Sequence, residues 1–241
     1  MCLPMSLLEW LRGPSKSLRY RFITNPANKL QYLTNYRAVG RTRLDYWADA
    51  IDKVQYPRID RDLSKDYLEN GRQQFEYLID NGLKPHHRFL DYGCGPMRGG
   101  LHIVPYLSEG LYVGADISRV FIQRGVRLLE KKGIQRDRYQ VVTIRDFDLT
   151  CLYGFEFDFG ASFSALQYVS DEDLKRILTG LRPLLKGPFH YNFPAPNKKA
   201  ELAMKGQYYR SPERIAAIAE PLGYTVTFQD GYPGDPMAIL Q

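Results

Sequence analysis

Cysteine is scarce in this chain of 241 residues. The three cysteines, Cys2, Cys94 and Cys151, lie far apart and show no C-x-x-C spacing. That distribution argues against a disulfide framework or a zinc site and favours a reducing compartment. We therefore expect a cytoplasmic protein without a structural metal.

Long apolar runs are missing as well. The longest stretch without a charged residue, Phe159–Ser170, has only twelve residues, too few to span a bilayer as a helix. The opening segment MCLPMSLLEWLRG contains Glu9 and Arg12 and no small-residue cleavage site, so we do not expect a secretory signal. The apolar fraction of 44% is ordinary for a globular protein, and the length suits one large domain with an extension.

Acidic side chains are nearly absent from residues 1–44, here called the basic arm. The arm has eight Lys and Arg residues and one acid, Glu9, giving a net charge of +7, whereas the remaining 197 residues have a net charge of −1. Its interleaved basic and aromatic residues fit docking on anionic lipid headgroups at a membrane periphery, contact with nucleic-acid phosphates, or packing on the main domain. We favour lipid over nucleic acid, and we divide the chain into an extension (1–64) and a main domain (65–241).

The segment 88–117 combines a short apolar strand, a glycine-rich turn, a helix over about 98–107 and a second strand that ends at Asp116. Such a unit builds parallel sheets. Glycines at 93 and 95 allow close approach of the backbone to a ligand, and the acid after the second strand is placed to accept hydrogen bonds from a ribose. A dinucleotide-binding turn would read G-x-G-x-x-G, but Arg98 stands at the third glycine position. A nucleotide-dependent oxidoreductase is therefore a weaker alternative.

The run Asp91-Tyr92-Gly93-Cys94-Gly95 resembles the first motif of class I S-adenosylmethionine-dependent methyltransferases, D/E-x-G-x-G-x-G, with Met97 in place of its third glycine. Asp116 falls where that family has its ribose-binding acid. The resemblance implies S-adenosyl-L-methionine as the cofactor, and Arg98 either pairs with its carboxylate or is simply exposed. The residues expected around the cofactor are Asp91, Tyr92, Gly93, Cys94, Gly95, Arg98, Asp116, Ile117, Asp146, Phe147 and Ser162.

The pattern downstream agrees with that family over roughly residues 67–241. Helices are expected over 67–83 and 119–132, and strands over 139–144, 157–162 and 189–193. Ser170 predicts the start of a further helix whose apolar face extends to Leu185, and Ser211-Pro212 the start of the last one. Segments 224–229 and 237–240 read as a closing hairpin. The fold predicted is α/β: a Rossmann-like, seven-stranded, mostly parallel sheet with helices on both faces and a C-terminal antiparallel hairpin.

The family places an acid on the adenine amino group after the third strand, followed by an apolar residue against the ring. Asp146 and Phe147 are the residues that we expect there. Phe147 with Asp148 is the competing pair, and a strand-end Asp that caps the next turn is the structural alternative.

Ligands of open parallel sheets bind beyond the carboxyl ends of the strands, which gives the candidate substrate-side residues. They are Gln167, Tyr168, Asn192, Tyr208, Tyr209 and Arg210, the last three within the loop KGQYYR. No catalytic residue is identified; His190, Gln167 and Tyr168 are weak candidates, and His190 and His102, both expected within regular elements, are more readily explained as structural. A strong base is optional because a sulfonium already makes its methyl group electrophilic, and proximity can contribute about 7–11 kcal/mol at best.

Missing motifs narrow the acceptor. After the fourth strand the chain reads Ser-Phe-Ser-Ala and not the Asp/Asn-Pro-Pro-aromatic tetrad of the family's amino-methylating nucleic-acid enzymes, and no cysteine follows a proline as carbon-5 pyrimidine methylation typically requires. We expect a hydroxyl or carboxyl acceptor on a small molecule, sugar or lipid-linked substrate. The alternatives are an RNA methyltransferase that uses the basic arm and a non-catalytic methyltransferase-like binding module. The oligomeric state is left open.

Overall fold

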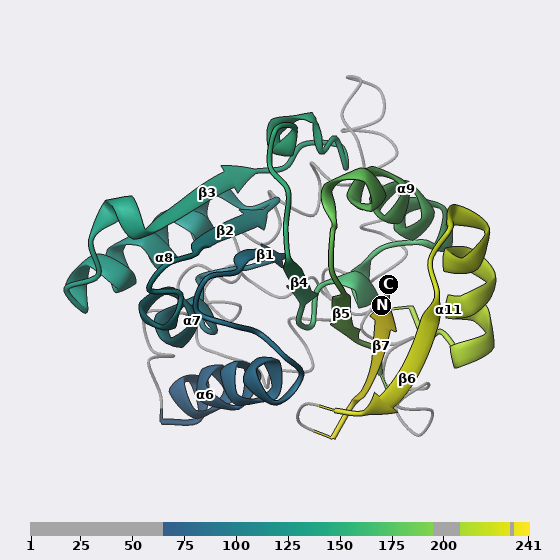
Figure 1. Ribbon diagram of the computed structural model, residues 1–241, viewed down its shortest axis with the longest axis horizontal. Coiled ribbons are helices and arrows are strands. Elements are labelled where there is room, and N and C mark those ends of the chain that lie inside the picture. The colour runs from purple at the N-terminus through teal and green to yellow at the C-terminus, as the bar shows by residue number, and fades with distance from the viewer. Residues whose placement is uncertain (1–64, 195–207, 232–233) are drawn as a thin grey trace, which may run out of the picture.

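The computed structural model describes residues 65–194, 208–231 and 234–241. Seven strands form one sheet in the order β3-β2-β1-β4-β5-β7-β6 (Figure 1). The strands are β1 (Arg88–Tyr92), β2 (Leu111–Asp116), β3 (Tyr139–Thr143), β4 (Phe159–Ser162), β5 (Phe189–Asn192), β6 (Val226–Asp230) and β7 (Pro236–Leu240). Strands β1 to β5 pair in parallel, whereas β7 is antiparallel to both β5 and β6. The predicted sheet and its closing hairpin are confirmed.

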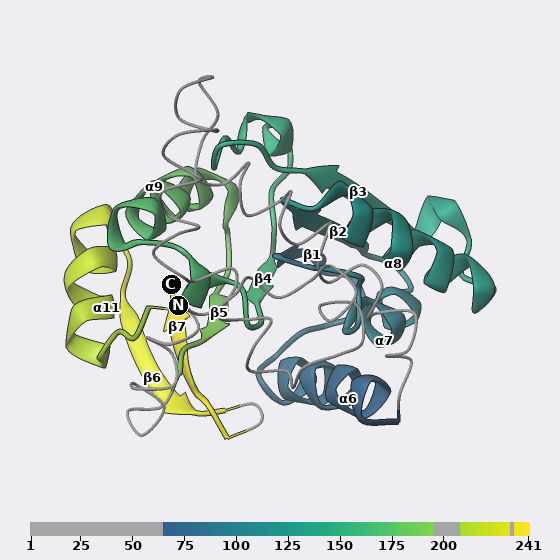
Figure 2. The same ribbon diagram turned by 180° about the vertical axis from the view of Figure 1, so that it is seen from behind.

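Helices cover both faces of the sheet, as predicted (Figures 1 and 2). The α-helices within the described residues are α6 (Lys65–Asp80), α7 (Gly100–Tyr106), α8 (Arg119–Lys131), α9 (Asp171–Leu181) and α11 (Pro212–Ala219). One hydrophobic cluster joins the sheet to α6, α7 and α8, and a second joins it to α9 and α11. Neighbouring strand residues alternate between the clusters: Phe89 belongs to the first and Leu90 to the second, and both are fully buried. Burial on both faces explains why these strands are continuously apolar.

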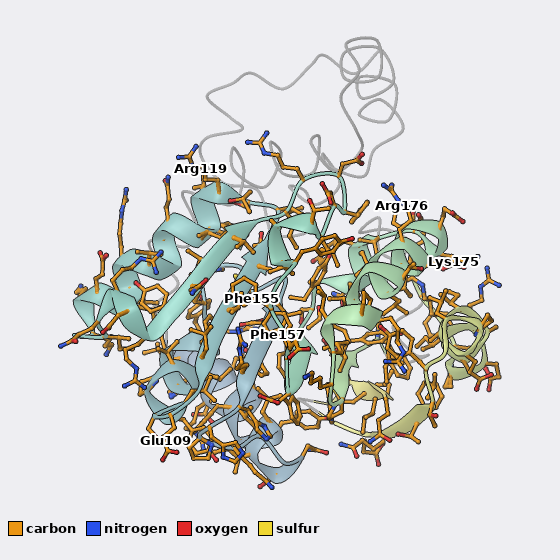
Figure 3. The ribbon with its side chains drawn as sticks, turned by 45° about the horizontal axis from the view of Figure 1, so that its top comes forward. Glu109, Arg119, Phe155, Phe157, Lys175 and Arg176 are labelled. Atoms are coloured by element: carbon orange, nitrogen blue, oxygen red, sulfur yellow. The ribbon has the colours of Figure 1, made fainter. Side chains whose placement is uncertain are left out.

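Aromatic residues fill the core where the chain enters β4. The rings of Phe155 and Phe157 stack with centroids 5.7 Å apart and an angle of 5° between their planes (Figure 3). Phe157 is fully buried, and the guanidinium of Arg88 lies 5.7 Å from the centre of the Phe155 ring. This packing fixes the start of β4 beside β1, to which β4 pairs.

Serine caps start three of the helices. The Oγ of Ser118 accepts the N–H of Phe121, that of Ser170 accepts the N–H of Asp173, and that of Ser211 accepts the N–H of Arg214. The two caps predicted from the sequence, Ser170 and Ser211, are confirmed. Helix α9 is shorter than its apolar pattern suggested, because it ends at Leu181 and gives way to a 3-10 turn that contains Pro183, a residue with no N–H to continue the ladder.

The order of the strands decides where a ligand can bind. From β1 the chain first builds β2 and β3 on one side, and then returns to place β4 and β5 on the other. The carboxyl ends of β1 and β4 therefore diverge at a topological switch point, where open α/β sheets bind their ligands. No helix within the described residues is long and apolar enough to cross a membrane. The basic arm and Lys205–Gln207 of the predicted substrate-side loop lie outside the described residues.

Candidate functional site

A cavity of about 280 Å³ opens at the carboxyl ends of β1, β2 and β4, at the switch point. Its lining includes most of the residues that the sequence predicted around a cofactor. Those residues are Asp91, Tyr92, Gly93, Cys94, Gly95, Arg98, Asp116, Ile117 and Phe147. Two predicted residues, Asp146 and Ser162, are not part of this lining. Within the described part of the chain the buried Ser162 hydroxyl has no hydrogen-bond partner.

The glycine turn after β1 has an unusual backbone. Gly93 and Gly95 both have positive φ angles, 77° and 51°, which glycine adopts without steric cost. The N–H groups of Gly93 and Cys94 both donate to the carbonyl of Ala115, at 2.7 and 3.2 Å, so the turn is attached to the end of β2. A Cβ atom on Gly93 would lie 2.3 Å from the Cβ of Ala165, whereas, of the described residues, one on Gly95 would contact only the ring of Phe121, at 3.9 Å. Glycine at 93 is thus required by the protein itself, while the space beside Gly95 is open.

Met97 occupies the third glycine position of the motif and keeps a positive φ of 56°. The left-handed conformation is strained for a residue with a side chain, but the Met97 side chain is fully buried. Gly100 and Gly125 leave room for it, because a Cβ at either position would approach Met97 to 3.0 Å or less. The turn therefore follows a left-handed path at 97, and the helix starts at Gly100 and not near Arg98 as the sequence suggested.

The carboxylate of Asp116, at the end of β2, accepts hydrogen bonds from the backbone of the glycine turn and of the start of α8. One carboxylate oxygen accepts the N–H of Gly95 at 2.8 Å, and the other accepts the N–H of Ser118 at 2.7 Å. These two bonds occupy one acceptor site on each oxygen, and a carboxylate has about four such sites. Asp116 joins the glycine turn, the start of α8 and the cavity in one side chain.

Asp91 is the second acid in the cavity, and it is buried. The hydroxyl of Tyr112 donates to its Oδ2 at 2.6 Å. Burial raises the pKa of Asp91 to about 6, helped by the negative charge of Asp116 and opposed by the Tyr112 hydrogen bond and the positive charge of Arg98. The carboxylate is therefore ionised at neutral pH, but at a cost in stability.

This cost makes the stability of the protein depend on pH. An acid whose pKa rises on folding keeps its proton in the folded state after the unfolded chain has lost it. The free energy of unfolding should therefore fall between about pH 4 and about pH 6, by about 3 kcal/mol for a rise of about two units. Asp91→Asn removes this contribution, so its stability relative to the unmodified protein should increase by that amount from about pH 4 to about pH 7. Urea unfolding of both proteins at the two pH values measures it, and identical pH dependence would exclude the effect.

Arg98 brings a positive charge to the cavity. Its side chain lies over the ring of Tyr67 from α6, with 5.6 Å from Cζ to the ring centre, and its buried Nε has no hydrogen-bond partner among the described residues. Helix α6 comes this close because Gly71 has no side chain: a Cβ there would lie 2.4 Å from the Arg98 carbonyl oxygen. A buried, unsatisfied guanidinium N–H is costly and provides a donor suited to a carboxylate.

The turn after β3 presents Phe147 to the cavity. Asp146 and Phe147 have positive φ angles of 49° and 55°, and the N–H of Asp148 donates to the carbonyl of Arg145. Arg176, on α9 (labelled in Figure 3), donates to the Asp146 carbonyl at 3.2 Å and lies 5.8 Å from the Phe147 ring centre. The Asp146 side chain is exposed and faces Arg176 at 4.0 Å, and Asp148 accepts the N–H of Thr150. Asp148 therefore caps the turn that follows it. A role for Asp146 at an adenine amino group stays a prediction.

Among the residues predicted for the substrate side, only Tyr168 lines the cavity. The carbonyl of Gln167 accepts the N–H of Tyr208, and the Oδ1 of Asn192 accepts the N–H of Ser164. Arg210 is buried and donates to the carbonyls of Leu166 and Val169; Tyr209 is half-buried outside the lining. These residues thus gather around the loop 163–169, which itself lines the cavity.

The two histidines considered as candidate bases, His190 and His102, lie away from the cavity lining. His190 is buried on β5, stacked on Phe159 with ring centroids 4.8 Å apart, and its Nδ1 lies 2.8 Å from the hydroxyl of Tyr77. Burial lowers its pKa to about 4, which makes it a weak base at neutral pH. His102 lies on α7 and stacks on Phe75. Both placements suit structural roles.

Several lining residues were missed by sequence reasoning. They are Tyr67, Gln74, Pro96, Gly99, Phe121, Ile144, Phe163, Ser164, Ala165, Leu166, Val169 and Asp173. Tyr67 and Gln74 come from α6, whose apolar periodicity indicated packing only. Residues 163–166 and 169 directly follow β4, and the rule that ligands bind beyond strand ends would have identified them if it had been applied to the whole loop.

Comparisons with known proteins agree with this geometry. Residues 89–187 match a family model described as a methyltransferase domain. Magnesium protoporphyrin IX methyltransferase from Synechocystis PCC 6803 with bound S-adenosylhomocysteine is 15% identical, with a TM-score of 0.65 over 82% of this chain and 99% of that chain. The same enzyme with bound S-adenosylmethionine is 14% identical, with a TM-score of 0.64 over 83% of this chain and 97% of that chain. The mitomycin 7-O-methyltransferase MmcR is 17% identical, with a TM-score of 0.65 over 83% of this chain and 60% of that chain.

Proposed function

We propose that this chain is a class I S-adenosylmethionine-dependent methyltransferase, as its match to a methyltransferase domain over residues 89–187 and its fold support, and that it methylates a hydroxyl or carboxyl group. The acceptor that we propose is a small molecule, a sugar or a lipid-linked substrate. The observation that carries the proposal is the bare glycine turn, with Asp91 and Asp116 beside it, at the mouth of the switch-point cavity. S-adenosylmethionine, when bound, supplies a methyl group made electrophilic by a sulfonium.

The residues of the cavity fit that cofactor. Among the described residues the buried Nε of Arg98 has no hydrogen-bond partner, which suits it to a carboxylate. Asp116 lines the same cavity with a carboxylate suited to ribose hydroxyls. The open space beside Gly95 admits a ligand against the backbone. Phe147 and Ile144 provide apolar surface on the same cavity, suited to a purine ring. These are the groups that we propose to hold the cofactor.

The loop after β4 supports a small acceptor. Phe163 and Tyr168 line the cavity beside the glycine turn, and aromatic walls orient an organic group and exclude water. Two of the similar structures are enzymes named for magnesium protoporphyrin IX and for mitomycin, both small molecules, which supports the same class here. The chain's own contribution is to bind, orient and dehydrate the reactants.

Calorimetric titration with S-adenosylhomocysteine tests the cofactor, and incubation with methyl-labelled cofactor and a fractionated cell extract tests transfer. We expect saturable binding and label in a small-molecule or lipid fraction. Binding without label in any fraction would favour a non-catalytic binding module. No binding at high micromolar concentration would exclude the proposal.

The basic arm favours one second candidate, an RNA methyltransferase. That function predicts retention of RNA with a steep dependence on salt, because neutralised phosphates release counterions, and loss of retention when residues 1–44 are deleted. If the arm instead docks on anionic lipid, the same deletion should abolish sedimentation with phosphatidylserine vesicles and leave RNA binding unchanged. A peripheral, cytoplasmic location is proposed on the second outcome.

A further inference from the structure

We infer that Arg210 is a positioning residue that holds the acceptor-side wall of the cavity in place. The inference rests on the proposed function and adds to it a residue that does not touch the cavity. The wall is the loop 163–169, which follows β4 and contains the 3-10 turn Leu166–Tyr168. Leu166 and Tyr168 from this turn, and Val169 just after it, line the cavity.

Arg210 forms hydrogen bonds at both ends of that turn. Its side chain is 5% exposed, and its Nη1 and Nη2 donate to the carbonyls of Leu166, at 3.2 Å, and Val169. Its Nε donates to Oδ1 of Asp171 at 2.7 Å, at the start of α9. A planar guanidinium has five N–H donors in fixed directions, so one buried side chain sets the spacing between the two carbonyls and the helix.

Other contacts show that this loop needs outside support. Ser164 has a positive φ of 58°, which is strained for a residue other than glycine, and its N–H donates to Asn192 at 2.6 Å. The N–H of Tyr208 donates to the Gln167 carbonyl at 2.7 Å. The loop also packs against the glycine turn, with Ala165 in the space that a side chain at 93 would occupy. A shift of the loop would thus move the acceptor wall relative to the cofactor turn.

Arg214 offers a matched control. Its Nε donates to the other oxygen of Asp171 at 2.7 Å, but its side chain is 58% exposed and, among the described residues, pairs only with Asp171. Arg210→Ala and Arg214→Ala therefore each remove one arginine from the same carboxylate, and only the first releases the loop. Arg210→Lys keeps the charge and loses the paired geometry.

Three measurements on the full chain test the inference: amide exchange of residues 164–170, affinity for S-adenosylhomocysteine, and methyl transfer to the extract fraction labelled by the unmodified protein. For Arg210→Ala we expect exchange at least about tenfold faster in this loop, affinity within about threefold, and transfer lower by about tenfold or more. Guanidinium ion at millimolar concentration should restore part of the transfer, a rescue that a general loss of stability would not show. Arg210→Lys should be intermediate, and it replaces Arg210→Ala if the latter unfolds at the assay temperature. Arg214→Ala should change none of the three.

Unchanged exchange in Arg210→Ala would overturn the inference, as would faster exchange with normal transfer. An equal loss of affinity and transfer would assign Arg210 to the cofactor site instead and would also overturn it. If the unmodified protein fails to bind S-adenosylhomocysteine, the proposed function fails, whereas the exchange of the loop still shows whether Arg210 holds it.

Discussion

Asp116→Ala is expected to lower the affinity for S-adenosylhomocysteine by at least about a hundredfold. The carboxylate accepts the N–H groups of Gly95 and Ser118 at 2.8 and 2.7 Å. Hydrogen bonds to charged groups contribute about 1.5–3 kcal/mol each. Alanine therefore removes the proposed ribose contact and at the same time releases the glycine turn that has to face the ligand.

Calorimetric titration of the folded variant measures the effect, with Glu156→Ala as the control. Glu156 is an exposed carboxylate paired with Lys186 at 2.6 Å, so its removal should leave the affinity unchanged. Asp116→Asn keeps one acceptor oxygen and should fall between alanine and the unmodified protein. Equal affinity in Asp116→Ala and the unmodified protein would remove the main support for a cofactor at this turn.

The sequence was most informative where function depends on neighbours in the chain. Asp91, Gly93 and Gly95 lie within five residues of one another, and Asp116 ends the strand that pairs directly with β1. Parallel pairing brings the ends of adjacent strands to one edge, so a motif and one downstream acid predicted most of this side of the cavity. Periodicity and caps likewise predicted the helices, because both are local signals.

Contacts between distant segments could not be predicted in the same way. Arg210 donates hydrogen bonds to the carbonyls of Leu166 and Val169, which are more than forty residues away in the sequence. Nothing in the local sequence distinguishes such a buried, bridging arginine from one that faces a substrate. Tyr67 reaches the cavity only because Gly71 lets α6 approach Arg98. Met97 departs from the glycine motif, and the room for its side chain depends on Gly125, which lies on helix α8. Each case requires a tertiary packing arrangement that the pattern of one segment does not contain.

Gly93→Ala and Gly95→Ala replace glycines of the same turn, but we expect the first to lower the stability of the protein strongly and the second to lower mainly its affinity for the cofactor. At 93 a Cβ would lie 2.3 Å from the Cβ of Ala165, and φ is 77°. The left-handed conformation costs about 1–2 kcal/mol for a residue with a Cβ, and overpacking typically costs a further 1–3 kcal/mol or so. Gly93→Ala should therefore lower the free energy of unfolding by about 2–5 kcal/mol and also abolish binding.

Gly95→Ala should lower the free energy of unfolding by only about 1–2 kcal/mol, the cost of its φ of 51°, since its Cβ would meet nothing closer than Phe121 at 3.9 Å. That Cβ would occupy space beside the backbone that the cofactor is proposed to use, so affinity for S-adenosylhomocysteine should still fall by about tenfold or more. Urea unfolding and calorimetric titration of both variants separate the two effects. Adding Ala165→Gly should recover the steric part of the Gly93→Ala loss but not the conformational part, and it should do nothing for Gly95→Ala. If Gly95→Ala binds as tightly as the unmodified protein, the ligand does not approach this turn, and the cavity serves some purpose other than holding the methyl donor.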